Sequence, residues 1–169
     1  YLLWYAIFND NVNIAILANK AATAREMLGR LQLSYENLPK WLQQGVVNWN
    51  RGSLELENGS KILAASTSAS AVRGMSFNII FLDEFAFIPT HIADEFFSSV
   101  YPTISSGKST KVIIISTPKG MNMFYKLWHD AEKGQNEYTT TEVHWQQVPG
   151  RDAKWKEETI RNTSEEQFN

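Results

Sequence analysis

The sequence contains no cysteine, so disulfide bonds, thiolate metal sites and cysteine nucleophiles are all excluded. It also lacks any apolar run of about 18 residues, the length that a membrane-spanning helix requires. Its first residues do not show the basic and then apolar pattern of a secretory signal peptide. We therefore expect a soluble protein of the cytosol that makes no use of a membrane.

An excess of charge of either sign is missing as well. The 16 lysines and arginines are balanced by 18 aspartates and glutamates, which leaves a formal net charge of −2. The overall charge therefore supplies no field that would attract nucleic acid. Any contact with DNA has to be local, or has to come from a part of the protein outside this sequence.

The residues that are present favour one globular domain of alternating strands and helices. A hydrophobic fraction of 43% over 169 residues is enough for a sizeable apolar core. Short apolar runs rich in β-branched residues predict buried strands at 12–18, 78–82 and 111–116. The remaining pattern predicts helices at 1–8, 22–35, 92–104 and 120–133, a strand at 138–145 and a polar, largely helical segment at 152–169.

Three short alternating segments at 46–50, 54–57 and 61–65 are separated by turn residues. The second turn, Asn58-Gly59-Ser60, is a strong hairpin signal, so these segments predict an antiparallel ribbon. Elsewhere buried strands alternate with helices, which is typical of a parallel sheet covered on both faces. The sequence thus predicts a three-layer α/β fold with a mostly parallel sheet.

The most informative stretch for chemistry is the apolar run 79–82, which is followed by Asp83 and Glu84. Ligands of open α/β sheets bind at the carboxyl ends of the strands, where these two carboxylates are expected to lie. Asp83 would then hold a Mg²⁺ ion, and Glu84 would polarise an attacking water. The alternative is an acidic pair that only favours the start of a helix through its dipole.

Two further sets of residues could act on a phosphate at the same edge. Ser116 and Thr117 follow the next apolar strand, where their hydroxyls could contact the terminal phosphate; an ordinary capped strand-to-helix turn is the alternative. Arg73 precedes Gly74 just before the strand that ends at Asp83, and could stabilise transition-state charge. An exposed arginine without such a role is the alternative there.

The whole sequence resembles the ATPase domain of the large terminase subunit of tailed bacteriophages, particularly the T-even type. Several blocks carry this resemblance in the order that the family has, and together they cover most of the chain. They are 16–20 (ILANK), 56–60 (LENGS), 71–77 (AVRGMSF), 81–89 (FLDEFAFIP), 104–107 (ISSG) and 116–120 (STPKG).

The resemblance implies an additional-strand, RecA-like P-loop NTPase fold that hydrolyses ATP with Mg²⁺ to drive viral double-stranded DNA into a prohead. It implies that Asp83 and Glu84 are the Walker B pair, that Ser116 and Thr117 lie in the coupling motif, and that Arg73 is a candidate arginine finger. It further implies the host cell cytoplasm as location. The expected partners are the portal of the prohead, the small terminase subunit and further copies of the same chain.

One departure from the family pattern concerns the phosphate-binding loop. No G-x-x-x-x-G-K-[ST] pattern occurs in the sequence, although the family should have one shortly before residue 1. We therefore expect 1–169 to be a single, partial ATPase domain that binds nucleotide weakly and is inactive by itself. The polar segment at about 151–169 is expected to lead toward a nuclease domain outside this sequence.

Three other functions have to be weighed against a packaging motor. A superfamily-two helicase or translocase has similar motifs in a similar order, but Phe85 and Ala86 depart from the residues usual after its acidic pair. A catalytically inert assembly module would not need the intact pair of Asp83 and Glu84. A two-metal nuclease would need a second acidic cluster after an apolar strand, and the sequence has none.

Overall fold

A computed structural model describes the chain except for residues 69, 71–74, 107–109 and 169. The chain divides into two compact units, Tyr1–Leu127 and Trp128–Asn169, which are described one at a time. Within the described ranges, no helix is long and apolar enough to cross a membrane.

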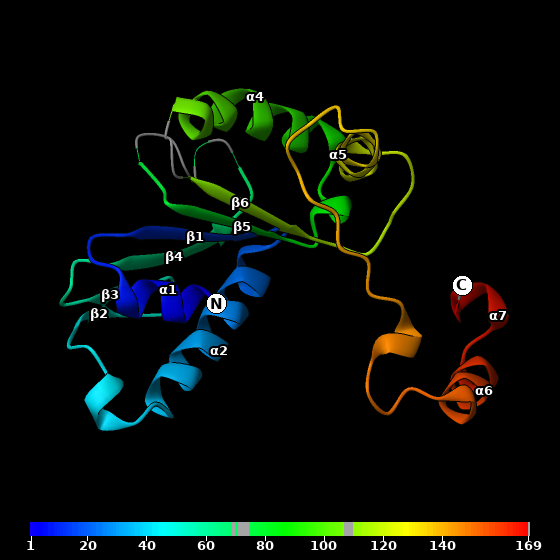
Figure 1. Ribbon diagram of the computed structural model, residues 1–169, viewed down its shortest axis with the longest axis horizontal. Helices are drawn as coiled ribbons and strands as arrows, with labels where there is room; N and C mark the ends of the chain where they lie inside the picture. The colour runs from blue at the N-terminus through cyan, green and yellow to red at the C-terminus, as the bar shows by residue number, and fades with distance from the viewer. Residues whose placement is uncertain (69, 71–74, 107–109, 169) are drawn as a thin grey trace. The chain divides into compact units, whose positions relative to one another are not determined.

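The first unit alternates strands and helices as the sequence predicts (Figure 1). Each strand and helix expected between residues 1 and 133 is present, with bounds that differ from the expectation by a few residues. In chain order the elements are α1 (Leu2–Phe8), β1 (Asn13–Ala18), α2 (Ala21–Glu36), η1 (Lys40–Leu42), β2 (Val46–Trp49), β3 (Ser53–Leu56), β4 (Lys61–Ser66), β5 (Ile79–Asp83), η2 (Phe85–Phe87), α4 (Thr90–Ser106), β6 (Lys111–Ile115) and α5 (Met123–Glu132), the last of which continues into the second unit.

One six-stranded sheet organises this unit, with strand order β2-β3-β4-β1-β5-β6. Strands β4, β1, β5 and β6, which are consecutive in the sheet, are parallel to one another. Strands β2 and β3 are antiparallel to their neighbours. The predicted antiparallel ribbon therefore exists, but it is part of the main sheet because β4 pairs with β1. The mostly parallel sheet confirms the expected fold class.

Two apolar cores lie on opposite faces of the sheet. One contains residues of α1 and α2 together with Ile14 and Ile16 of β1, and the other contains residues of α4 and the first turns of α5 together with Ala15 and Leu17. Figure 1 shows α1 and α2 on one side of the sheet and α4 on the other. Since successive residues of β1 point to opposite faces and both faces are covered, all residues from Ile14 to Ala18 are fully buried.

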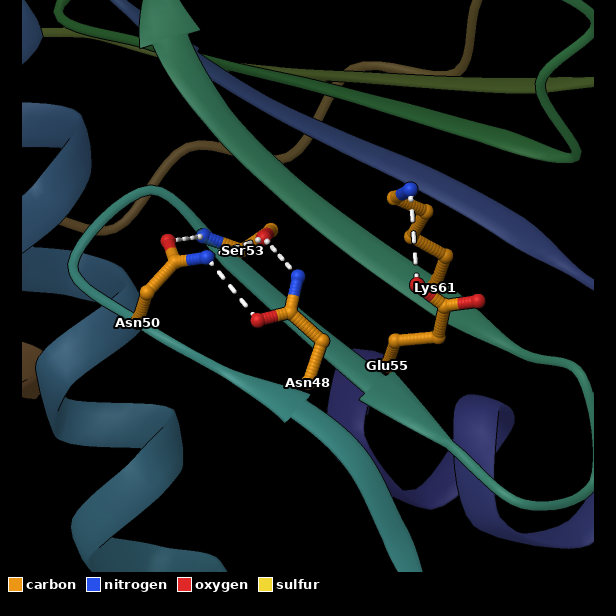
Figure 2. A network of polar contacts seen from close by, with 5 residues as sticks. All are labelled: Asn48, Asn50, Ser53, Glu55 and Lys61. Carbon is orange, nitrogen blue, oxygen red and sulfur yellow. Dashed lines mark hydrogen bonds and ion pairs between the residues drawn. The ribbon is translucent and has the colours of Figure 1, made fainter.

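The β2–β3 turn is held by its own side chains, as Figure 2 shows. Asn50 Oδ1 accepts hydrogen bonds from the backbone N–H groups of Gly52 (2.8 Å) and Ser53 (2.9 Å). The Ser53 hydroxyl oxygen accepts from the side-chain amides of Asn48 (3.2 Å) and Asn50 (3.0 Å). These contacts order the turn locally. Gln32 of α2 donates to Asn50 O (2.9 Å) and Ala64 N of β4 donates to Gly52 O (2.8 Å), which ties the turn to the rest of the unit.

The second unit contains two helices, α6 (Ala153–Asn162) and α7 (Glu165–Phe168), after the short helix η3 (Trp145–Gln147). Trp145, Trp155 and Phe168 pack against one another, with ring centroids 5.5 to 6.0 Å apart. Asp152 caps α6 by accepting a hydrogen bond from Trp155 N. The expected helical segment at 152–169 is therefore confirmed.

The strand predicted at 138–145 is wrong. Residues 138–144 have no regular secondary structure, and η3 begins at Trp145. Threonine, tyrosine and valine favour strands only where a neighbouring strand can pair with them, and none pairs with this segment within the described residues. The composition of the segment was a poor guide for that reason.

Candidate functional site

The four parallel strands of the sheet end at one edge, and the strand register defines which residues lie side by side there. Ser66 of β4 and Asp83 of β5 both pair with Ala18 at the end of β1. Asp83 in turn pairs with Ile115 at the end of β6. Because neighbouring strands lie about 4.8 Å apart, the residues that follow Asp83 and Ile115 leave the sheet close together. This edge therefore brings Asp83 and Glu84 near the segment of Ser116 and Thr117, as the sequence predicts.

The acidic pair stands at the end of a rigid strand. Residues Ile79 to Leu82 of β5 are buried, Asp83 is half-buried and Glu84 is exposed. Glu84 has a left-handed backbone (φ 50°, ψ 36°), which is uncommon for a residue other than glycine. The chain turns there, and Phe87 N donates a hydrogen bond to Glu84 O (2.9 Å) to close the turn of η2.

The carboxylates of Asp83 and Glu84 have no partner among the described residues. Within the part of the chain that the structure describes, neither makes a hydrogen bond or an ion pair. That part also holds no group of three or more His, Asp or Glu side chains that could bind a metal ion alone. The pair fits a Mg²⁺ ion that arrives with a nucleotide, because such an ion takes only one or two protein carboxylates and completes its shell with phosphates and water.

Ser116 and Thr117 have different surroundings although they are adjacent. The half-buried Ser116 hydroxyl accepts a hydrogen bond from Ala86 N (3.0 Å) and donates one to Thr117 O (2.9 Å). Thr117 is exposed, and its hydroxyl has no partner among the described residues. The Thr117 hydroxyl is therefore available to a ligand, whereas the Ser116 hydroxyl binds the loop that follows Glu84.

The structure adds Asn122, which the sequence analysis did not single out. Its side-chain amide donates to Ala86 O (2.7 Å) and to Lys119 O (2.9 Å). Its side-chain oxygen accepts from Tyr125 N (3.2 Å) at the start of α5. An asparagine directly before the first turn of an apolar helix is an N-cap signal, so this last contact was detectable in the sequence. The contacts to Ala86 and Lys119 were not.

Arg73, the remaining predicted site residue, lies outside the described residues. Its predicted role in stabilising charge on a phosphate therefore stays a prediction.

A family model for the N-terminal part of the terminase large subunit of the T4-like virus type matches residues 1–169. Solved structures of large terminases share the fold at low sequence identity. They include the ATPase domain of the Thermus phage P74-26 large terminase, with a TM-score of 0.68 and 21% identity over 99% of this chain and 77% of that one.

Two further structures match in the same way. The large terminase of bacteriophage HK97 has a TM-score of 0.68 and 19% identity over 99% of this chain. A large terminase from a thermophilic bacteriophage, in complex with ADP, has a TM-score of 0.67 and 14% identity over 95% of this chain. The chain spans only 37% and 39% of those two proteins.

Proposed function

The chain belongs to the family of T4-like terminase large subunits, as part of their N-terminal region, and from this premise we propose that it works in an ATPase motor that packages viral DNA. The observation that carries the proposal is the acidic pair Asp83 and Glu84, which has no partner among the described residues and follows a buried central strand. Ligands of open α/β sheets bind at that edge. The ADP complex of the large terminase from the thermophilic bacteriophage supports a nucleotide as the ligand.

In the proposed site Asp83 holds the Mg²⁺ ion of MgATP, directly or through a water. The ion, when bound, neutralises charge on the phosphate oxygens. Glu84 orients and polarises the attacking water, for which its exposed carboxylate and its position on the turn are suited. Thr117 follows β6, the strand next to the one that ends at Asp83, and its hydroxyl contacts the terminal phosphate. Ser116, the other hydroxyl that the sequence assigns to the nucleotide, already donates to Thr117 O and accepts from Ala86 N, so it supports the site by holding the loop after Glu84.

We also propose that Arg73 supplies positive charge to the transferring phosphoryl group. The support is its place in the sequence, a few residues before the strand that ends at Asp83, and the arginine finger that the resemblance to the family implies. Replacement of Arg73 by alanine should slow ATP hydrolysis more than it weakens ATP binding, because an arginine finger acts on charge that develops in the transition state.

The outer edge of β6 is the expected place for a further strand of the full-length protein. The strand reads Lys111-Val112-Ile113-Ile114-Ile115, an apolar pattern typical of the middle of a parallel sheet. Only β5 pairs with it among the described residues, and Ile115 is 50% exposed. We propose that the strand that carries the phosphate-binding loop pairs with this edge, and that this chain provides the acidic half of the ATP site.

The proposed partners follow from the family. The motor acts on viral double-stranded DNA in the cytoplasm of the host cell, at the portal of a prohead. The small terminase subunit and further copies of the large subunit are the other proposed partners. The nuclease activity is assigned to a further domain of the full-length protein.

The test is the ATPase activity of the full-length protein and of its Glu84→Gln variant. Loss of the carboxylate should lower kcat by about 10² to 10⁴, the range that a general base contributes, with little change in thermal stability. Glu36→Gln is the matched control, because Glu36 is an exposed carboxylate at the far end of α2. The proposal is contradicted if the full-length protein without substitutions has no ATPase activity, or if the Glu84→Gln variant is as active as the control.

A further inference from the structure

Ala86 lies two residues after Glu84, and both of its backbone polar groups are held by side chains from the segment after β6. Ala86 is 3% exposed, so its N–H and C=O groups need partners inside the protein. The Ser116 hydroxyl accepts from Ala86 N at 3.0 Å, and the Asn122 amide donates to Ala86 O at 2.7 Å. This clamp joins segments that lie 30 and 36 residues apart in the sequence.

The clamp acts on the backbone that carries the proposed general base. Glu84 has a left-handed conformation, which a residue other than glycine keeps only where its surroundings hold it. The turn from Glu84 to Phe87 is closed by one backbone hydrogen bond, from Phe87 N to Glu84 O. Ala86 lies inside that turn, so a shift of Ala86 moves Glu84 as well.

Asn122 also fixes the segment that carries Thr117. Its amide group has two donor hydrogens, and the second one binds Lys119 O at 2.9 Å. The Lys119 ammonium lies 4.6 Å from the centre of the Phe87 ring, which gives a second link between the two segments. Ser116 and Lys119, on either side of Thr117, are thus both tied to the loop after Glu84 or to Asn122.

We propose that Asn122 is a positioning residue for ATP hydrolysis, which sets the place of Glu84 relative to Thr117; this inference rests on the proposed function. Asn122 does not itself contact the nucleotide. A small displacement of a group that orients the attacking water lowers kcat far more than it weakens substrate binding. Its loss should therefore affect kcat and leave the KM for ATP nearly unchanged.

The substitution Asn122→Asp separates positioning from stability. An aspartate keeps the oxygen that caps α5 through Tyr125 N, but it cannot donate to Ala86 O or Lys119 O. Asn122→Ser keeps a capping oxygen without a charge and is too short to replace both donors. Asn37→Asp is the control, because Asn37 is an exposed asparagine at the end of α2.

Two readouts on the full-length protein test the inference. Steady-state ATPase activity of Asn122→Asp should show kcat lower by about tenfold to a hundredfold and KM for ATP within about twofold. Hydrogen exchange of the peptide 84–88 should be faster in Asn122→Asp. Without the Asn122 bond to Ala86 O the turn opens more often, and the bond from Ala86 N to Ser116 opens with it, while the peptide 21–36 in α2 exchanges as before. Asn122→Ser should behave in the same way, and Asn37→Asp should change neither quantity.

Each outcome decides one of the two proposals. An unaltered protein that hydrolyses no ATP contradicts the proposed function, while hydrogen exchange still reports whether Asn122 holds the loop. An active protein in which Asn122→Asp keeps its kcat overturns the positioning role. A lower kcat with unchanged exchange at 84–88 also overturns it. If Asn122→Asp fails to fold, Asn122→Ser provides the same comparison.

Discussion

The Asn58–Ser60 turn at the amino end of the parallel sheet and the acidic pair at its carboxyl end differ in whether their polar side chains have partners. At the amino end, the Asn58 amide donates to Ala6 O (2.9 Å) and Asn9 O (3.2 Å), and the Ser60 hydroxyl donates to Asn9 O (2.6 Å). At the carboxyl end, the side chains of Asp83 and Glu84 have no partner among the described residues. Paired polar groups hold the fold together, whereas carboxylates that the fold does not use are available to a ligand. The first end should therefore matter for stability and the second for activity.

The amino end shows how completely such groups can be used. Ser60 is fully buried, and its hydroxyl also accepts from Val12 N at 3.3 Å. Asn58 Oδ1 accepts from Ser60 N at 3.0 Å, which closes the β3–β4 turn under the end of α1. These contacts join the end of α1 and the start of β1 to the antiparallel ribbon, which lies 48 to 52 residues further along the chain.

Beside Glu84→Gln, the largest effect that distinguishes the two ends is expected for Asp83→Asn. The variant removes the carboxylate that is proposed to hold Mg²⁺, so ATPase activity of the full-length protein should fall by about 10² to 10³. Its thermal unfolding should shift little, because the side chain of Asp83 makes no hydrogen bond or ion pair within the described residues. Steady-state kinetics over a range of Mg²⁺ concentrations, together with calorimetry, provide the measurement. A variant that loses stability and keeps its activity would reverse the assignment of this end.

The next effect belongs to the amino end and is one of stability. Ser60→Ala leaves Val12 N without its buried partner and removes the shorter of the two side-chain hydrogen bonds to Asn9 O, and should lower the free energy of unfolding by about 1 to 3 kcal/mol. The activity of the folded molecules should not change. Urea unfolding measures the difference, and Ser34→Ala serves as the control because Ser34 is an exposed serine on α2. Equal unfolding free energies for the two variants would show that the buried network contributes nothing.

The smallest effect concerns pH and a tyrosine away from the carboxyl edge. Burial, and secondly the negative charge of Glu57, raises the pKa of Tyr35 above its usual value. The Tyr35 hydroxyl donates to Gln44 O and needs its proton for that contact. The folded chain therefore keeps this proton at a pH where the unfolded chain, with a tyrosine pKa of about 10, releases it.

The resulting stability is fully present below about pH 10 and is lost as the pH rises through the pKa of Tyr35 in the folded protein. Tyr35→Phe should be less stable than the unaltered protein at pH 8, by about 0.5 to 1.5 kcal/mol for one hydrogen bond. That difference should shrink above about pH 10. Urea unfolding at several pH values measures it, and a difference that stays constant to about pH 11 would contradict the role of the Tyr35 proton.

The buried strands were predictable because their sequences allow few alternatives. The apolar runs that form β1, β5 and β6 are too short for helices and too apolar for an exposed strand. The hairpin of β3 and β4 was predictable from Asn58-Gly59-Ser60, since Gly59 adopts a positive φ of 78° that few other residues tolerate. That β4 pairs with β1 was not predictable, because pairing between distant strands leaves no local pattern.

The site likewise contains one feature with a local sequence pattern and one without. The acidic pair was found because an apolar strand that ends in two carboxylates is a local signal. The clamp on Ala86 was missed because it depends on tertiary contacts from Ser116 and Asn122 to a backbone group, which any residue at that position would offer. The strand expected at 138–145 failed for a related reason, since side chains that favour a strand do not supply its neighbour.

The most direct test of the account is a structure of the full-length protein with Mg²⁺ and ADP–beryllium fluoride, which imitates bound ATP. We expect the phosphates at the carboxyl edge of the sheet, with Asp83 coordinating the metal ion directly or through one water. The Glu84 carboxylate should lie within hydrogen-bond distance, about 2.6 to 3.2 Å, of the water in line with the terminal phosphate mimic. A nucleotide bound elsewhere, with Asp83 and Glu84 facing only solvent, would contradict the central claim.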